Sequence, residues 1–363
     1  MSGPLHSMHI IGSWQFGGAE RFFLRLVEAL HQSGDRVTAV YRGKSRVRQA
    51  LAGQIERIEL PMFNNIWDFY SPLKIRALVK QRRPDIVQTY MGRASHMTRI
   101  GRGWKSLHVA RLGGFYKVRG YYEHADAWVA NSRELYEYLA AQGLPRERLY
   151  RIGNFVAIEP PTAAADLAAL RRRSGIPAEA LIIFSLGRLI EIKGFADLLE
   201  AFSRLPRTIG GRPLWLMLAG AGPLRKPLLH RAEQLSITDR VCWPGWQDQP
   251  GPLFDLADLF VCPSIRETLG NVILEAWAHR LPVVATATSG ARELIRDGVN
   301  GLLCPRRDPA ALAERCSLLL REGAATRENL AAAGMTSLIS AHSQPAVVAA
   351  YRDMYWELIR KYR

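Results

Sequence analysis

Short apolar runs alternate with helical patterns along the whole chain. The run at 181–186 is typical of a strand buried on both faces of a parallel sheet. After it, apolar residues recur from Phe195 to Phe202 at the spacing of one helix face. Comparable runs predict further strands at 9–11, 37–41, 58–60, 85–90, 109–114, 125–132, 214–219, 259–262 and 283–285. Strands that alternate with helices predict an α/β fold with parallel sheets.

The chain is long enough for two domains of ordinary size, at 363 residues. A proline- and alanine-rich segment begins at Glu159 and is typical of a linker. We therefore expect one domain over 1–156 and a second over 157–343. Apolar residues from Val347 to Ile359 recur at helical spacing, so 344–363 is predicted to be a terminal helix.

Composition indicates a soluble globular protein, with 48% apolar and 23% charged residues. No apolar stretch approaches the roughly 20 residues of a membrane span, and the N-terminus lacks the pattern of a signal peptide. The four cysteines have neither metal-ligand spacing nor the pattern of a disulfide scaffold. They are expected to be buried thiols of a cytoplasmic protein. The cysteines are Cys242, Cys262, Cys304 and Cys316.

The net charge of +16 is concentrated in the first half of the chain. Residues 1–156 contain 24 Lys and Arg against 12 Asp and Glu. Nucleic acid, anionic lipid and a phosphorylated glycan are all partners that such a surface attracts. The segment 62–83 combines aromatic and basic residues. It is predicted either to lie on an anionic membrane surface or to be a core-packing helix with a charged outer face.

Two glutamates bracket a predicted helix start after the strand at 259–262. Glu267 lies in the loop and Glu275 in the second turn of the helix. Helix N-termini offer free N–H groups to anions. We therefore expect a phosphate at the amides between the glutamates, and each carboxylate directed at hydroxyls of a sugar or a ribose. The alternative is two surface glutamates on an ordinary helix. The amides in question belong to Thr268, Leu269, Gly270 and Asn271.

Cations and glycines follow other predicted strands. Arg188 and Lys193 come after the strand at 181–186, framed by Gly187 and Gly194, and this arrangement suits a diphosphate. A glycine pair, Gly17 and Gly18, separates the strand at 9–11 from a helix. Glycine lets a backbone come close to a pyrophosphate or sugar, although most such pairs are simple turns. Gly222 lies in a further glycine turn after the strand at 214–219.

These motifs resemble the retaining nucleotide-sugar glycosyltransferases of family 4. The match rests on Glu267 and Glu275 with seven residues between them, followed by Ala276, 282–285, Gly290, Glu293 and 297–303. Residues 267–270 read Glu-Thr-Leu-Gly instead of the more usual Glu-Gly-Phe-Gly. This departure keeps the phosphate amides and changes the side chain beside the sugar.

The resemblance implies the GT-B fold, in which two doubly wound Rossmann-like domains face each other across a cleft and the terminal helix returns to the first domain. It implies sugar transfer from a nucleotide sugar, with a UDP-sugar favoured, and retention of anomeric configuration. No metal and no cofactor are expected. The catalytic residues it implies are Arg188, Lys193 and Glu267. The donor-binding residues it implies are Gly17, Gly18, Gly187, Gly222, Thr268, Leu269, Gly270, Asn271 and Glu275, the last on the ribose.

A histidine that many members carry in the first domain has no match in this chain. His96, His108 and His124 are only nearby candidates for a base. The identity of any such base is left open.

The acceptor is expected to be a lipid-linked or phosphorylated glycan, as in lipopolysaccharide core or another surface polysaccharide. Such an enzyme would be cytoplasmic and peripheral, at the inner face of the membrane, with an anionic membrane surface as a partner of its basic first domain. Two alternatives differ in class. One is a glycosidase that uses Glu267 and Glu275 as its acid and nucleophile. The other is a nucleic-acid-binding protein, although no recognised nucleic-acid motif is present.

Overall fold

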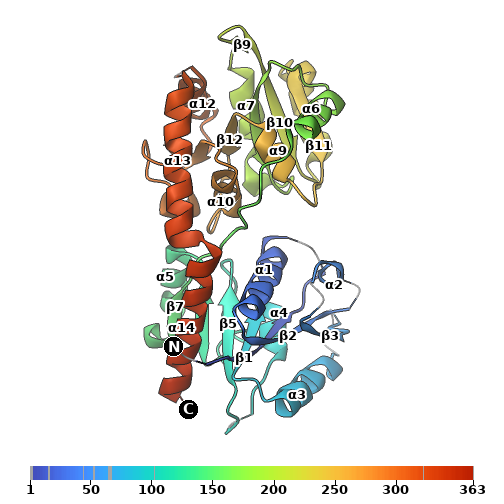
Figure 1. Cartoon of the computed structure of the whole chain (residues 1–363), viewed down its shortest axis with the longest axis vertical. Coiled ribbons are helices and arrows are strands. Elements are labelled where there is room, and N and C mark those ends of the chain that lie inside the picture. Colours follow the sequence, from blue (N-terminus) through green and yellow to red (C-terminus); the bar gives the residue numbers. More distant parts are fainter. Residues whose placement is uncertain are drawn as a thin grey trace. The chain divides into compact units, whose positions relative to one another are not determined.

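The computed structural model describes residues 3–14, 17–43, 45–51, 54–63, 68–101, 103–321 and 323–362. The chain divides into two compact units. The N-terminal unit comprises Met1–Phe155 together with Gln344–Arg363, and the C-terminal unit comprises Val156–Ser343. Each unit has a parallel sheet with helices packed against it, which confirms the predicted Rossmann-like α/β fold (Figure 1).

The N-terminal unit has a seven-stranded sheet in the order β3-β2-β1-β4-β5-β6-β7. All its pairings are parallel. The chain runs outward from β1 in both directions, so the strand order reverses between β1 and β4. In sheets of this kind, ligands bind beyond the carboxyl ends of the strands at such a reversal. The strands are β1 (His6–Ile11), β2 (Arg36–Arg42), β3 (Glu56–Leu60), β4 (Ile86–Tyr90), β5 (Leu107–Leu112), β6 (Ala127–Ala130) and β7 (Leu149–Arg151).

The first helix of this unit begins at Gly18, within the glycine pair that the sequence places before a helix. Ser132 caps α5, because its side chain accepts the N–H of Leu135. In the segment 62–83 the helix begins only at Tyr70. The helices are α1 (Gly18–Gln32), α2 (Val47–Ala50), α3 (Tyr70–Arg82), α4 (Met91–Met97), α5 (Arg133–Ala141), the 3-10 turn η1 (Arg146–Arg148) and α14 (Gln344–Tyr362).

The terminal helix α14 packs in the core of the N-terminal unit. Tyr351 and Tyr355 are fully buried there, in one cluster with Phe22 and Phe23 of α1. Buried hydrogen bonds also connect α14 to the sheet. The Tyr355 hydroxyl donates to Gln88 Oε1 at 2.5 Å, and Gln88 Nε2 donates to the Tyr90 hydroxyl at 2.8 Å. The helix is therefore part of this domain despite its distance along the chain.

The C-terminal unit has the strand order β11-β10-β8-β12-β13-β14, and a short strand β9 pairs antiparallel with β10. Apolar clusters cover both faces of this sheet. The strands are β8 (Leu181–Leu186), β9 (Thr208–Ile209), β10 (Arg212–Ala219), β11 (Val241–Gly245), β12 (Leu259–Cys262), β13 (Val283–Thr286) and β14 (Leu302–Cys304).

Helices alternate with the strands of this unit as the sequence predicts. Its four cysteines are free thiols, and Cys262, Cys304 and Cys316 are buried. Within the described ranges, no helix has the length and the apolar character needed to span a bilayer. The helices are α6 (Ala164–Arg173), the 3-10 turn η2 (Glu191–Lys193), α7 (Phe195–Ser203), α8 (Arg225–Gln234), the 3-10 turn η3 (Thr238–Arg240), α9 (Gly251–Leu256), α10 (Asn271–Ala278), α11 (Ser289–Leu294), α12 (Pro309–Arg321) and α13 (Gly323–His342).

Candidate active site

The predicted donor residues of the C-terminal unit lie on loops at the carboxyl ends of its strands. Arg188 follows β8, Gly222 follows β10, and Glu267 follows β12. Because β8 pairs in parallel with both β10 and β12, these loops leave the sheet at the same edge. Arg188 and Glu267, 79 positions apart in the sequence, are thereby gathered at one edge.

Lys193 and Glu267 form an ion pair at this edge. Lys193 Nζ lies 2.5 Å from Glu267 Oε2, and each side chain is 18% exposed. The Ser264 hydroxyl donates a second hydrogen bond to the same carboxylate oxygen, at 3.2 Å. Charge-assisted hydrogen bonds of this kind are stronger than neutral ones. The pair therefore holds both ionised groups in one place.

Opposing effects set the pKa of Lys193. Burial is the largest single effect and lowers the pKa, but the charge and the hydrogen bond of Glu267, together with Cys262, raise it by more, so the net pKa lies above its ordinary value. The charge of Arg188 acts in the lowering direction, which places this second cation within electrostatic reach. Arg188 itself is exposed, and no ion pair joins it to any other described residue. The site thus presents two cations, one of them already neutralised by a carboxylate.

Backbone hydrogen bonds fix the loop that carries Glu267. The Ile265 N–H donates to the Ile192 carbonyl at 2.9 Å, and the Gly290 N–H donates to the Glu267 carbonyl at 3.1 Å. Gly194 allows the first of these contacts. Its φ is +67°, and a Cβ there would overlap the carbonyl oxygen of Pro263. The η2 turn and the β12–α10 loop are therefore held against each other.

The helix α10 begins where the two-glutamate motif predicts it. Gly270 is its N-cap, with φ +89°, and Asn271 is its first residue. Thr268 is half-buried and Leu269 is buried. The first amides of an α-helix have no partner within the helix, so this end of α10 is suited to an anion. Glu275, in its second turn, is half-buried.

Two further glycine turns meet at the same edge. A Cβ on Gly222 would lie 2.5 Å from the Leu189 carbonyl oxygen, so the turn after β10 contacts the turn after β8 backbone to backbone. At Gly187 a Cβ would meet the ring of Phe195 at 3.2 Å. Both glycines keep side chains out of the space between these loops.

The glycine pair of the N-terminal unit has a structural role. Gly17 is the N-cap of α1, and Gly18 is the first residue of that helix. The Gly17 N–H donates to Glu20 Oε2 at 2.8 Å, so the protein itself uses this donor. Contact of Gly17 and Gly18 with the donor stays a prediction.

Family models match both halves of the chain. Residues 16–160 match the model described as Glycosyltransferase Family 4, and residues 167–336 match the model described as Glycosyl transferases group 1. The chain is a family 4 glycosyltransferase. This membership decides against both alternatives raised by the sequence, a glycosidase and a nucleic-acid-binding protein.

Similar proteins cover nearly all of the glycosyltransferase. It is 34% identical to the lipopolysaccharide core biosynthesis glycosyltransferase LpsE of Rhizobium meliloti (strain 1021), over 93% of this chain and 95% of LpsE. A glycosyltransferase of Rickettsia africae has the same fold, with a TM-score of 0.86 at 19% identity and complete coverage of both chains. So does Anabaena HepE in a complex with UDP-glucose, with a TM-score of 0.80 at 19% identity over 98% of this chain and 100% of HepE.

The three candidate histidines of the glycosyltransferase make internal contacts. His108 is buried, with Nε2 2.9 Å from the Thr89 hydroxyl, and burial together with Arg99 lowers its pKa to about 3. His124 contacts two backbone carbonyls, and His96 contacts the carbonyl of Gly120. The structure therefore singles out none of them as a base.

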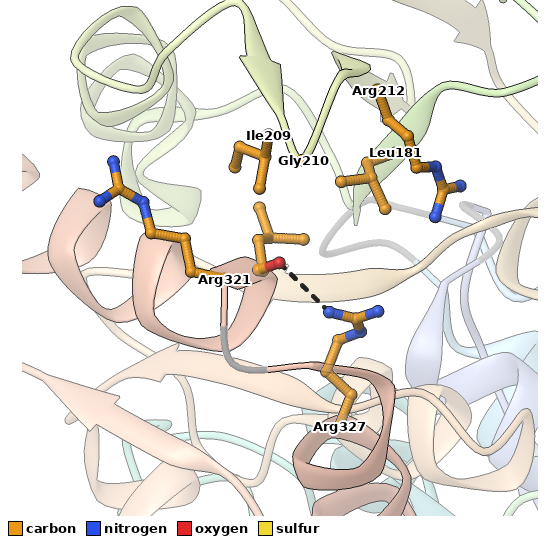
Figure 2. Close-up of a pocket in the computed structure, with 7 residues that line it drawn as sticks. Leu181, Ile209, Gly210, Arg212, Arg321 and Arg327 are labelled. Carbon is orange, nitrogen blue, oxygen red and sulfur yellow. Dashed lines mark hydrogen bonds between the residues drawn. The ribbon is translucent and has the colours of Figure 1, made fainter.

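A cavity of about 260 Å³ lies at the opposite edge of the C-terminal sheet (Figure 2). Leu181, the first residue of β8, lines it together with Arg212, Arg321 and Arg327. Arg327 Nη1 donates to the carbonyls of Leu319 and Leu320 at the end of α12. Arginines at a helix C-terminus stabilise that helix, and the cavity lies away from the loops that carry Lys193 and Glu267.

Proposed function

We propose that this glycosyltransferase transfers a sugar from a UDP-sugar to a lipopolysaccharide core acceptor, with retention of anomeric configuration. The cation pair Arg188 and Lys193, brought together with Glu267 at the carboxyl edge of the C-terminal sheet, carries the proposal. LpsE, similar over nearly its whole length, supports the acceptor class. HepE, with the same fold, supports the donor class. The resemblance of the Glu267 and Glu275 motif to the retaining family supports retention.

Transfer requires stabilisation of the negative charge that develops on the departing diphosphate. Cations placed in advance do this better than water, because they need no reorganisation during the reaction. In the proposal, Arg188 and Lys193 bind the diphosphate. The phosphate oxygens replace Glu267 as the counter-ion of Lys193, which frees the Glu267 carboxylate to accept hydrogen bonds from donor-sugar hydroxyls.

The remaining donor residues would surround the nucleotide. The amides of Thr268, Leu269, Gly270 and Asn271 at the start of α10 would bind phosphate oxygens. Glu275 would accept hydrogen bonds from the ribose. The turns at Gly187 and Gly222, together with Gly17 and Gly18, would leave room for the backbone to approach the donor.

The proposed enzyme acts as a peripheral protein at the inner face of the cytoplasmic membrane, where a lipid-linked acceptor is found. Helix α3 supports this placement. Phe69 and Leu73 are 65% and 67% exposed at its first turn, and Lys74, Arg76 and Lys80 are exposed along it. The helix contains no acidic residue. Apolar and basic groups on one exposed helix suit a bilayer with anionic lipids.

A thermal-shift panel with UDP, GDP, ADP and CMP tests the donor half of the proposal. UDP at 100 times its Kd should stabilise the protein by about 2.7 kcal/mol. We expect Glu275→Ala to abolish this shift, and Glu233→Ala, an exposed control on α8, to retain it. No shift with any of the four nucleotides would overturn the proposal.

Product analysis tests the reaction. Incubation of a UDP-sugar panel with truncated lipopolysaccharide core should give a glycosylated acceptor whose new linkage keeps the anomeric configuration of the donor. Nuclear magnetic resonance of the product reports that configuration directly. An inverted linkage would disprove retention, and transfer only to acceptors unrelated to lipopolysaccharide would disprove the acceptor class.

A further inference from the structure

Arg42 is a buried cation at the carboxyl end of β2. Arg42 is 4% exposed, and its Nε and Nη1 have no hydrogen-bond partner among the described residues. A buried charged group without a partner destabilises a fold. Its unused donors indicate that a bound group completes this site.

Three side chains surround this guanidinium. The Trp14 ring centroid lies 3.7 Å from Arg42 Cζ. Burial lowers the pKa of Arg42, the charge of Arg93 lowers it further, and Asp68 acts in the opposite direction. Asp68 Oδ1 accepts the Ser71 N–H at 3.0 Å, and no ion pair joins Asp68 to Arg42. Arg42 and Arg93 carry two positive charges and Asp68 carries one negative charge, so the net charge of the site is positive.

Arg93 approaches from the neighbouring element. Its Nη1 donates to the carbonyls of Met62 and Phe63. Its aliphatic stem crosses the end of β1, where a Cβ on Gly12 would lie 3.1 Å from Arg93 Cδ. Because Gly12 has no side chain, it leaves room for the Arg93 side chain.

The fold places this cluster at a ligand-binding position. Gly12 follows β1, and Arg93 lies in α4 directly after β4, so the two flank the reversal of strand order in the N-terminal sheet. Met91, between β4 and Arg93, has a φ of +66°, a conformation that non-glycine residues rarely adopt. Strained backbone often occurs at binding sites.

We propose that Arg42, Arg93 and Trp14 form a subsite for an anionic group, a phosphate or carboxylate, carried by the acceptor sugar. The inference rests on the proposed function, because it takes the bound sugar to be the acceptor. The donor diphosphate has its own cations, Arg188 and Lys193, in the other unit. Arg42 and Arg93 are therefore left for a second anion.

Trp14 gives the subsite its preference for a sugar. Arg42 covers one face of the ring, yet Trp14 is 56% exposed, so its other face is open to solvent. Aromatic faces of this kind bind the apolar face of a pyranose, while the guanidinium groups bind phosphate or carboxylate oxygens in a forked geometry. A phosphorylated or acidic sugar satisfies both parts of the subsite.

Binding of simple sugars in the presence of saturating UDP tests the inference. The probes are glucose 6-phosphate, glucuronate and neutral glucose, titrated by calorimetry and by tryptophan fluorescence. We expect the two anionic sugars to bind and glucose to bind at least about tenfold more weakly. Arg42→Met and Arg93→Gln should each weaken glucose 6-phosphate by about ten- to a hundredfold, the range for a lost hydrogen bond to a charged group.

Control variants separate this subsite from general charge. Arg36→Gln removes an exposed arginine at the opposite end of the same strand and should leave binding unchanged. Trp14→Phe should remove the fluorescence response while calorimetry still detects the anionic sugar. Arg42→Met should also raise the melting temperature of the ligand-free protein, by about 2–4 °C, because it removes a buried charge.

Several outcomes would overturn the inference. One is equal affinity for glucose and glucose 6-phosphate, and another is an equal loss of glucose 6-phosphate affinity in Arg36→Gln and Arg42→Met. A third is binding to phosphatidylglycerol vesicles that depends on Arg42, without binding of either anionic sugar. UDP binding is measured in the same samples. Its absence would disprove the donor proposal, whereas intact UDP binding without anionic-sugar binding would disprove only this subsite.

Discussion

Lys193 and Glu267 neutralise each other at the candidate active site. A half-buried lysine without a counter-ion would be unfavourable, and Glu267 supplies one 2.5 Å away. The donor diphosphate is proposed to exchange places with this carboxylate. In the proposal, the pair thus keeps the Lys193 cation in place for the diphosphate.

Lys193→Met should lower kcat/KM by about 10²–10³, the range for loss of one charge-stabilising group in a transition state. Lys193→Arg should retain part of the activity, because it keeps the charge. Steady-state kinetics with a UDP-sugar measures both. Lys226→Met, at an exposed position of α8, is the control and should behave as wild type. Full activity of Lys193→Met would remove this residue from the reaction.

Two buried histidines predict how stability depends on pH. Burial lowers the pKa of His9 to about 3, and burial with the charge of Arg99 does the same for His108. Below pH 6.5 the unfolded chain binds protons at these positions and the folded chain does not. The free energy of unfolding should therefore fall as pH decreases from about 6.5 towards 3, by about 1.4 kcal/mol per pH unit for each histidine.

Urea unfolding at pH 7 and pH 5 measures this dependence. His108→Gln should reduce the difference between the two pH values, because glutamine does not titrate. His230→Gln removes an exposed histidine and serves as the control. If the free energy of unfolding of His108→Gln differed between pH 7 and pH 5 as much as that of the wild type, His108 would take up its proton in the folded state.

Helix α14 shows how an element distant in sequence becomes part of a domain. Its apolar spacing predicts a helix, and Tyr351, Met354 and Tyr355 of that pattern are buried in the N-terminal unit. Apolar burial alone would allow the helix to slide or rotate. The hydrogen bond from Tyr355 to Gln88 requires one position of the helix, because Gln88 is itself held by its hydrogen bond to Tyr90.

Tyr355→Phe should destabilise the protein by about 1–3 kcal/mol, because it leaves buried Gln88 Oε1 without its donor. Tyr150→Phe removes another hydrogen bond to α14, that between Tyr150 and Glu357 at 3.0 Å, but at the surface. Water replaces a lost partner there, so the change should stay within about 0.5 kcal/mol. Denaturant unfolding compares the two variants. Equal losses would mean that burial of the Gln88 bond has no effect on stability.

Helix α3 combines two alternatives that the sequence left open. Ile75 and Val79 are buried, as expected of a core-packing helix, and Lys74 and Lys80 are exposed on the outer side. The large exposed apolar side chains among the described residues of this segment are Phe63, Phe69, Tyr70 and Leu73, before the helix and at its start. Aromatic and basic composition over 62–83 could not separate these parts, because only the packing of the helix decides which face is covered.

The whole molecule is strongly asymmetric in charge, since 1–156 contributes +12 of the total +16. If α3 lies on an anionic bilayer, the full chain should co-sediment with vesicles that contain phosphatidylglycerol at low salt. Binding should weaken as salt screens the charges. Lys74→Glu should weaken it by several-fold, since one basic residue near such a surface contributes about 1 kcal/mol.

Two controls apply to the vesicle experiment. Neutral phosphatidylcholine vesicles should bind little protein, and Lys226→Glu makes the same charge change on α8 of the other unit. A Leu73→Ser variant tests the apolar part at constant charge and should also bind less. Equal binding of the Lys74 and Lys226 variants would disprove the role of α3.

Local pattern determined most of the fold. A run such as 181–186 has so many apolar side chains that only a buried strand can accommodate it, and β8 has the same bounds. The strand at 259–262 is likewise β12. Short strands such as β9 and β14 lack a pattern of their own, because two or three residues cannot show a period and pairing with a neighbour defines them.

The sequence by itself also determined the chemical types at the candidate active site, since Arg188, Lys193 and Glu267 each follow a strand whose carboxyl end can be recognised locally. Only the tertiary structure decided their partners. Glu267 meets Lys193 across 74 positions because β8 and β12 are neighbours in the sheet. Arg42 was one basic residue among many in the sequence, and only packing shows that it is buried and that its Nε and Nη1 have no hydrogen-bond partner among the described residues. Burial and pairing are set by contacts between distant segments, and no local pattern contains them.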